Sequence, residues 1–215
     1  RIVATKGMLH PYCMSSKTLR KRLAMATLSR DLLSKAHRIL ALNDEESEAI
    51  EQRFGVGRGG VLPNGIDLAS LPTGDEAAFR ATCPSLGDRP YFVFIGRLNV
   101  IKGVDVLLEA FFKCRADGHD IDLVLIGPDS GMVENIRSRI QEAGAKNVVH
   151  ITGPVYGEQK YDALKGARAF AMPSRYEGWG NAVVESMAMA TPVVISPQCH
   201  LPDIEKTKTG LVAER

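Results

Sequence analysis

The stretch YFVFIGRLNVIKGVDVLLEAFFKCRADGHDIDLVLI, residues 91–126, decides the fold class. It begins with a continuous apolar run at 91–95 and ends with another at 123–126. Between these runs, apolar side chains recur at the spacing of one helix face: Val104, Leu107, Leu108 and Phe111. Short apolar strands joined through a helix are typical of a parallel sheet that is covered on both faces. The stretch therefore predicts a strand–helix–strand unit.

The same alternation continues along the chain to residue 212. We predict further strands at 148–151, 169–172, 192–195 and 211–212. We predict helices at 133–143, 158–165 and 182–189. This pattern indicates a doubly wound α/β domain, in which ligands bind outside the carboxyl ends of the strands. The loops that follow residues 95, 126, 151, 172 and 195 are therefore the candidate site.

The part of the chain before residue 90 has a different pattern. We predict a strand near residues 1–8, a helical stretch at 16–38 and a short buried strand at 39–42. Asn43 with the acids that follow it predicts the capped start of a helix that ends near residue 54. Residues 55–90 are rich in Gly, Pro and polar residues. We place a domain boundary within them, which divides the chain into residues 1–68 and 69–215.

Composition excludes several classes of protein. Of 215 residues, 45% are apolar and 24% are charged, as in soluble globular proteins. No apolar run approaches the ~18 residues of a membrane span, so a membrane-spanning protein is not expected. The cysteines show no Cys-x-x-Cys spacing, which favours a reducing, cytoplasmic setting over a disulfide framework. They are Cys13, Cys83, Cys114 and Cys199.

The loop GRLNVIKG, residues 96–103, follows the first strand of the regular pattern. Gly96 permits a tight exit from the strand, while Arg97 and Lys102 supply two cations beside the start of the next helix. A helix N-terminus with two cations suits a diphosphate. The spacing is neither that of a Walker loop nor that of a GxGxxG dinucleotide loop. The alternative is a basic turn that faces solvent.

The loop PSRYEGWGN, residues 173–181, leads into a helix with two carboxylates eight positions apart, Glu177 and Glu185. Glu185 falls on a mainly apolar face, where a carboxylate needs hydrogen-bond partners. The vicinal hydroxyls of a ribose are suitable partners. The alternative is that Glu177 caps the helix and that Glu185 is exposed to solvent.

The string EGWGNAVVE, residues 177–185, resembles the E-x7-E motif of the retaining family 4 glycosyltransferases, which have the GT-B fold. Other stretches resemble elements of this family in the same order along the chain: 63–67, 94–103, 173–174, 186–188, 191–194 and 209–212. The resemblance implies two Rossmann-like domains. It further implies that residues 1–68 are the incomplete end of an N-terminal acceptor domain. Residues 69–215 would then form a nucleotide-sugar-binding domain without its closing helices.

The resemblance also implies an activity, which is transfer of a sugar from a UDP- or GDP-linked donor to a saccharide or lipid-linked acceptor, with retention of configuration. We expect this in the synthesis of bacterial cell-surface polysaccharide or lipopolysaccharide. The implied catalytic residues are Arg97, Lys102 and Glu177. The residues implied to bind the nucleotide-sugar are Gly96, Gly153, Val155, Gly178, Trp179, Gly180, Asn181, Ala182 and Glu185. Arg97 and Lys102 would hold the diphosphate, Glu185 the ribose and Glu177 the sugar, with no metal or cofactor.

Three other features are not carried over to the site. His10 follows Gly7 instead of preceding a glycine, so the family's substrate-contacting histidine is not assigned to it. Cys199 with His200 has no further metal ligands nearby in the sequence. The Asp-Ile-Asp string at 120–122 precedes a strand, so we interpret it as a polar turn.

The charge distribution suggests a surface partner. Residues 1–38 contain nine Lys or Arg and one acid, Asp31, whereas the rest of the chain is net acidic. We predict that residues 16–38 dock on an anionic membrane surface at the cytoplasmic face; the alternative is a solvated helix face. Nucleic acid is not an expected partner, because the segment lacks interleaved aromatic residues. The alternative functions are a nucleotide-sugar epimerase or phosphorylase of the same fold, or a non-catalytic nucleotide-sugar-binding module.

Overall fold

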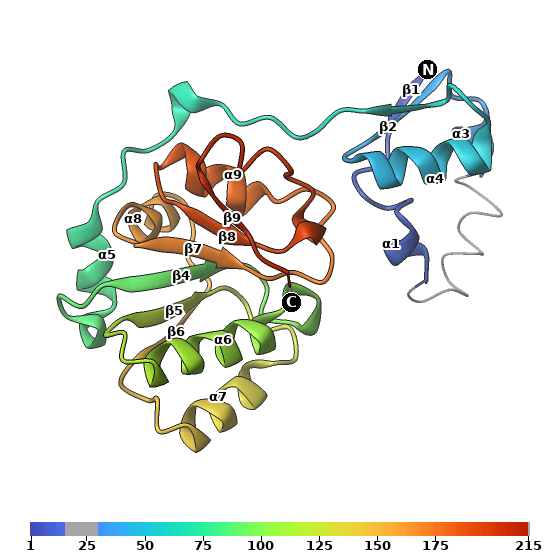
Figure 1. Cartoon of the computed structure of the whole chain (residues 1–215). Coiled ribbons are helices and arrows are strands. Elements are labelled where there is room, and N and C mark those ends of the chain that lie inside the picture. Colours follow the sequence, from blue (N-terminus) through green and yellow to red (C-terminus); the bar gives the residue numbers. More distant parts are fainter. Residues whose placement is uncertain (16–29, 215) are drawn as a thin grey trace. The chain divides into compact units, whose positions relative to one another are not determined.

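The structure is a computed structural model that describes residues 1–15 and 30–214 (Figure 1). The chain divides into two compact units, Arg1–Gly65 and Ile66–Arg215. The predicted helical stretch at 16–38 lies outside the described residues over 16–29. Its described part differs from the prediction, because α3 (Arg30–Ser34) ends four residues early and strand β2 begins at Arg38.

The first unit contains a parallel sheet with the strand order β1 (Ile2–Ala4), β2 (Arg38–Ala41), β3 (Gly59–Val61). The described residues of this unit also form α1 (Pro11–Ser15) and α4 (Asp44–Phe54). α4 packs along β2 and β3, where Ile39 and Ile50 are completely buried. As predicted, Asn43 caps α4 by accepting a hydrogen bond from the amide of Glu46 at 2.9 Å.

A buried carboxylate fastens the loop that follows β1. Glu46 is fully buried, and its Oε1 accepts hydrogen bonds from Thr5 Oγ1 at 2.8 Å and Leu9 N at 3.1 Å. Its Oε2 accepts from Gly7 N at 3.1 Å and Leu42 N at 3.0 Å. The first turn of α4 therefore holds the backbone of residues 5–9 in place.

A strand and an α-helix lie in residues 55–90, the stretch that the sequence presents as a linker. β3 pairs with β2, and α5 (Glu76–Thr82) buries Phe79 in the core of the second unit. A Cβ on Gly59 would lie 2.7 Å from Ser47 Oγ and 2.9 Å from Ser47 O. Close packing of β3 against α4 therefore requires glycine at this position. Because glycine is typical of loops, the sequence of this strand predicts a loop.

The second unit is a six-stranded, fully parallel sheet with the order β6–β5–β4–β7–β8–β9. The strands are β4 (Tyr91–Ile95), β5 (Asp122–Ile126), β6 (Val149–Gly153), β7 (Ala169–Met172), β8 (Val193–Ile195) and β9 (Gly210–Val212). This is the strand order of the Rossmann fold, and it confirms the predicted doubly wound α/β domain.

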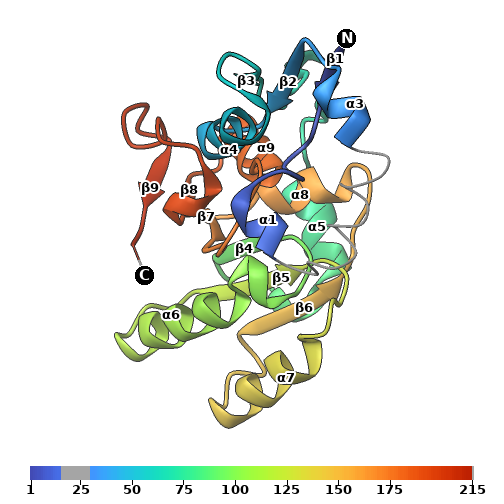
Figure 2. The same cartoon turned by 90° about the vertical axis from the view of Figure 1, so that its right-hand side faces the viewer.

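Helices cover both faces of this sheet (Figures 1 and 2). The helices α6 (Val104–Ala116) and α7 (Val133–Glu142) lie on one face. The other face carries α5, α8 (Gln159–Lys165) and α9 (Asn181–Ala188). Among the described residues, no helix is long and apolar enough to cross a membrane.

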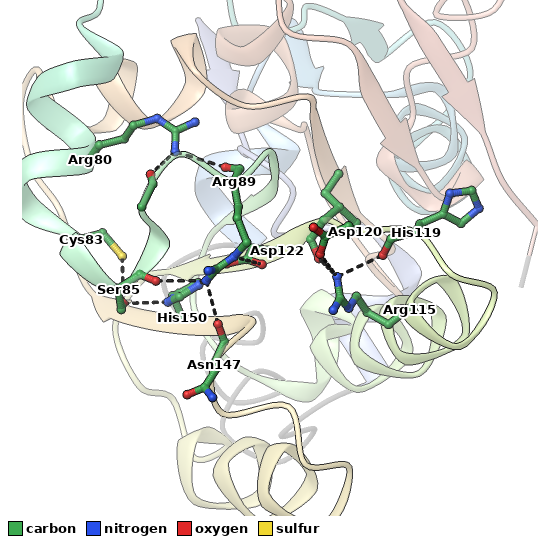
Figure 3. A network of polar contacts seen from close by, with 12 residues as sticks. Arg80, Cys83, Ser85, Arg89, Arg115, His119, Asp120, Asp122, Asn147 and His150 are labelled. Atoms are coloured by element: carbon green, nitrogen blue, oxygen red, sulfur yellow. Dashed lines mark hydrogen bonds and ion pairs between the residues drawn. The ribbon is translucent and has the colours of Figure 1, made fainter.

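A polar network lies at the amino ends of β5 and β6 (Figure 3). Asp122 is fully buried and accepts hydrogen bonds from Arg89 Nη2 at 2.8 Å and His150 Nε2 at 2.7 Å. Ser85 Oγ lies 2.8 Å from His150 Nδ1. The hydrogen bond to Asp122 raises the pKa of Arg89. The network fastens the segment before β4 to the sheet.

The interpretation of residues 120–122 as a polar turn was wrong for one of the two acids. Asp122 is the first residue of β5 and is buried in the network. Asp120 is exposed and pairs with Arg115 Nη1 at 2.6 Å. The two carboxylates therefore hold different partners (Figure 3).

Candidate functional site

The strand order of the second unit reverses between β4 and β7. In parallel α/β sheets, ligands bind outside the carboxyl ends of the strands at such a switch point. Two loops meet there, residues 96–103 after β4 and residues 173–180 after β7. These are the two loops that the sequence selects as the diphosphate loop and the carboxylate loop.

The two loops are in close contact. Gly103 has a φ of 69°, and a Cβ at this position would lie 2.0 Å from the carbonyl oxygen of Pro173. Arg175 N donates a hydrogen bond to Ile101 O at 2.7 Å. Glycine is therefore required at position 103 both by its backbone conformation and by the neighbouring loop.

Arg175 joins the two loops through its side chain. Nη1 donates to Asp105 Oδ1 at 2.7 Å, and Nη2 donates to Asp105 Oδ2 at 2.6 Å. Nη1 also donates to Val100 O at 2.6 Å. The hydrogen bond from Arg175 is the main cause that lowers the pKa of Asp105. Sequence reasoning missed this pair, for which the only signal is an acid in the first turn of the helix after the basic loop.

The structure brings two predicted catalytic residues together. Lys102 Nζ forms an ion pair with Glu177 Oε2, and both side chains are largely buried. Glu177 N also donates to Gln198 O at 3.1 Å, which ties this loop to the segment after β8. Arg97 lies in the same loop as Lys102 and is exposed. The loops at the switch point thus carry an ion-paired ammonium and carboxylate, together with an exposed arginine, a set of groups suited to an anion that carries hydroxyl groups.

Glu185 lies in the second turn of α9, where its carboxylate has a protein partner. Lys160 Nζ, from α8, lies 2.8 Å from Glu185 Oε1. The same ammonium lies 4.7 Å from the centre of the Tyr161 ring. The sequence indicates that Glu185 needs a partner, but nothing in it singles out Lys160.

The remaining predicted residues border these loops. Gly96 follows β4, and Gly153 ends β6 with a φ of 76°. Val155 packs against the core of the unit. Gly180 is the N-cap of α9 and precedes its first residues, Asn181 and Ala182. Gly178 and Trp179 lie between Glu177 and this cap.

Trp179 has a buried polar atom in the loop that precedes α9. Its indole Nε1 is buried and has no hydrogen-bond partner among the described residues. Buried polar groups are normally hydrogen-bonded, so this indole N–H is an exception within the motif loop.

Cys199 belongs to the core beside this site. Its Sγ donates to Met172 O at 3.5 Å, and burial raises the pKa of the thiol. A buried, protonated thiol is a packing residue and a poor metal ligand.

A family model described as glycosyl transferases group 1 matches residues 75–215, well over half of the chain. The chain belongs to this family. The match contains both loops of the switch point as well as Lys160 and Glu185.

Curated relatives include D-inositol 3-phosphate glycosyltransferases. The one from Nocardia farcinica is 28% identical over 173 residues, which cover 77% of this chain and 38% of the relative. The one from Segniliparus rotundus is 30% identical over 145 residues, which cover 66% of this chain and 32% of the relative. The chain thus spans less than half the length of these relatives.

Solved structures share the fold. WaaG, a glycosyltransferase involved in lipopolysaccharide biosynthesis, matches 98% of this chain with 60% of its own, at a TM-score of 0.73 and 16% identity. Anabaena Alr3699/HepE in complex with UDP matches 99% of this chain with 57% of its own, at a TM-score of 0.78 and 20% identity. The predicted GT-B fold class and the family are thereby confirmed.

Proposed function

We propose that this glycosyl transferases group 1 chain supplies the nucleotide-sugar site of a retaining enzyme. The enzyme transfers a sugar from a UDP- or GDP-linked donor to a saccharide or lipid-linked acceptor, without a metal ion. The observation that carries the proposal is the meeting of Lys102 and Glu177 at the switch point of a Rossmann sheet. An Anabaena protein of the same fold is known in complex with UDP-glucose, which supports this class of sugar donor.

Each charged group has a distinct role in the proposal. Lys102 and Arg97 bind the diphosphate and stabilise the negative charge that grows on it as the glycosidic bond breaks. Glu177 accepts hydrogen bonds from hydroxyls of the transferred sugar. Glu185 accepts hydrogen bonds from the ribose. The leaving phosphate assists the incoming hydroxyl on the same face of the sugar, which retains the configuration.

Neighbouring backbone completes the proposed site. The loop of Gly153 and Val155 faces the nucleobase, and residues 178–182 lie along the sugar and phosphates. Residues 1–68, which include the first unit, form part of the acceptor domain. Curated relatives are named D-inositol 3-phosphate glycosyltransferases, and the acceptor that we propose for this enzyme is a saccharide or a lipid-linked molecule.

We place the enzyme on the cytoplasmic side of the membrane, in the synthesis of cell-surface polysaccharide. The basic segment 16–38 would bind anionic lipid, although its residues 16–29 lie outside the described part of the chain. Of its described cations, Lys35 forms an ion pair with Asp31 at 2.7 Å, which lowers the net positive charge that the segment offers to lipid. Co-sedimentation with anionic and neutral vesicles tests this placement, and equal binding to both would refute it.

Calorimetry with UDP and GDP tests the proposed site. Lys102→Met should weaken binding about tenfold or more, because a charge-assisted hydrogen bond to phosphate is lost. Lys113→Met, which removes an exposed cation from α6, is the matched control and should leave the Kd unchanged. Failure of the wild-type chain to bind either nucleotide would refute the proposal.

A further inference from the structure

The ion pair between Lys160 and Glu185 links two helices that both begin at the site. α8 follows the loop after β6, and α9 follows the loop after β7. The side chains are partly shielded, with 26% of Lys160 and 20% of Glu185 exposed. Salt screens such an ion pair less than one on an open surface. The attraction between the two charges is therefore stronger and holds the side chains together.

The pair uses one oxygen of the carboxylate. Lys160 contacts Oε1 at 2.8 Å, while Oε2 accepts no hydrogen bond from the residues that the structure describes. The position of the ammonium is itself restricted by the Tyr161 ring, 4.7 Å away. Glu185 is therefore held with one oxygen occupied and the other available to a ligand.

We propose that Lys160 is a positioning residue for ribose recognition. It holds the carboxylate of Glu185 in one orientation, so that Oε2 accepts a hydrogen bond from a ribose hydroxyl of the nucleotide. The inference rests on the proposed function, because it assumes that a nucleotide binds at the switch point. It adds a residue on α8, outside the two motif loops, that determines discrimination between ribose and deoxyribose.

The alternative role for an ammonium at this place is direct contact with the phosphates or the base. The two roles make different predictions. A residue that acts through Glu185 affects only ligands that carry the ribose hydroxyl. A residue that binds phosphate or base affects ribonucleotides and deoxyribonucleotides equally.

The test is a set of dissociation constants, measured by calorimetry on the whole chain. The ligands are UDP, 2′-deoxy-UDP and 3′-deoxy-UDP, with the matching guanosine nucleotides in parallel. The variants are Lys160→Met, Lys160→Gln and the conservative Lys160→Arg. Lys165→Met, which removes an exposed cation from the same helix, is the control. Trp179 fluorescence and thermal melting establish that each variant is folded.

We expect the wild-type chain to bind at least one deoxynucleotide about tenfold more weakly than its ribonucleotide, as for a hydrogen bond to a charged group. In Lys160→Met and Lys160→Gln, this ratio should fall below about threefold. Lys160→Arg and Lys165→Met should keep the wild-type ratio.

Three results would overturn the inference. The first is a wild-type chain that binds ribonucleotides and deoxyribonucleotides equally. The second is a wild-type ratio retained in Lys160→Met. The third is an equal loss of affinity for both kinds of nucleotide. A wild-type chain that binds no nucleotide would overturn the proposed function instead, and the inference with it.

Discussion

Replacing Glu46 with Gln should destabilise the first unit, because one hydrogen-bond acceptor oxygen becomes an NH2 donor and the negative charge is lost. The carboxylate accepts four hydrogen bonds, three of them from backbone amides. Each carboxylate oxygen accepts from two donors. Glutamine offers one oxygen and one NH2 group, so the two donors on one side would face the NH2 group, which is itself a donor. Because Glu46 is fully buried, water does not compensate.

The contacts decide which way the amide lies. An NH2 at the place of Oε2 would face two N–H groups, those of Gly7 and Leu42. At the place of Oε1 it would face Leu9 N–H and the Thr5 hydroxyl, which can turn to accept because it also lies 3.1 Å from the Leu40 carbonyl. The second arrangement leaves one buried N–H unpaired.

The expected destabilisation follows from these contacts. An unsatisfied buried N–H costs about 1–3 kcal/mol, and each of two remaining bonds loses about 1 kcal/mol when its acceptor becomes neutral. The sum is about 3–5 kcal/mol. That is large for a unit of this size, since small domains bury a limited share of their surface.

Hydrogen exchange followed by mass spectrometry measures this effect within one unit. Peptides that cover residues 2–9 and 38–61 should exchange more than about a hundredfold faster in Glu46→Gln. Peptides from the sheet of the second unit serve as an internal reference. Glu48→Gln, which changes an exposed carboxylate of the same helix, is the matched control. Equal protection in the two variants would refute the reasoning.

Two further substitutions test other parts of the second unit. Arg89→Met removes the guanidinium that pairs with the fully buried Asp122 and should lower the free energy of unfolding by about 2–4 kcal/mol. The loss is limited because His150 still donates to that carboxylate. Arg115→Met breaks the exposed pair with Asp120 and should change the free energy of unfolding by less than about 1 kcal/mol. Urea denaturation compares the two, and a smaller effect for Arg89→Met would contradict the buried network. Gly103→Ala places a Cβ against the Pro173 carbonyl and should weaken UDP binding more than tenfold, as the loops are forced apart. Gly118→Ala is its control, with a φ of 93° and open space around it; equal UDP affinity of the two variants would show that the loop contact is unimportant.

The sheet of the second unit could be predicted because its strands are continuous apolar runs, as at 91–95 and 123–126. β3 could not, because Gly59 is required by its close contact with Ser47 on α4, and a tertiary contact leaves no local pattern in the sequence. The same holds for Asp122, which looks like part of a polar turn. Its burial is possible because Arg89 and His150, which lies on the neighbouring strand β6, donate hydrogen bonds to its carboxylate.

The candidate site divides in the same way. Lys102 and Glu177 were selected because each belongs to a recognisable loop after a strand. Lys160 and Arg175 were not selected, since both resemble ordinary surface cations in the sequence. Their importance comes from the carboxylates that they meet, 25 and 70 positions away in the chain.

The strand order also has a consequence for how the molecule folds. β4 and β7 pair at the centre of the sheet, although every other pair in this sheet joins strands that follow one another directly. Pairing these two strands closes a long loop of chain at an entropic cost, and such distant pairings slow folding. Lys102 and Glu177 lie 75 positions apart on the two sides of that pairing, so they meet only when it is complete. A molecule that binds both residues therefore selects fully folded chains, and it raises their apparent stability in proportion to the logarithm of its concentration.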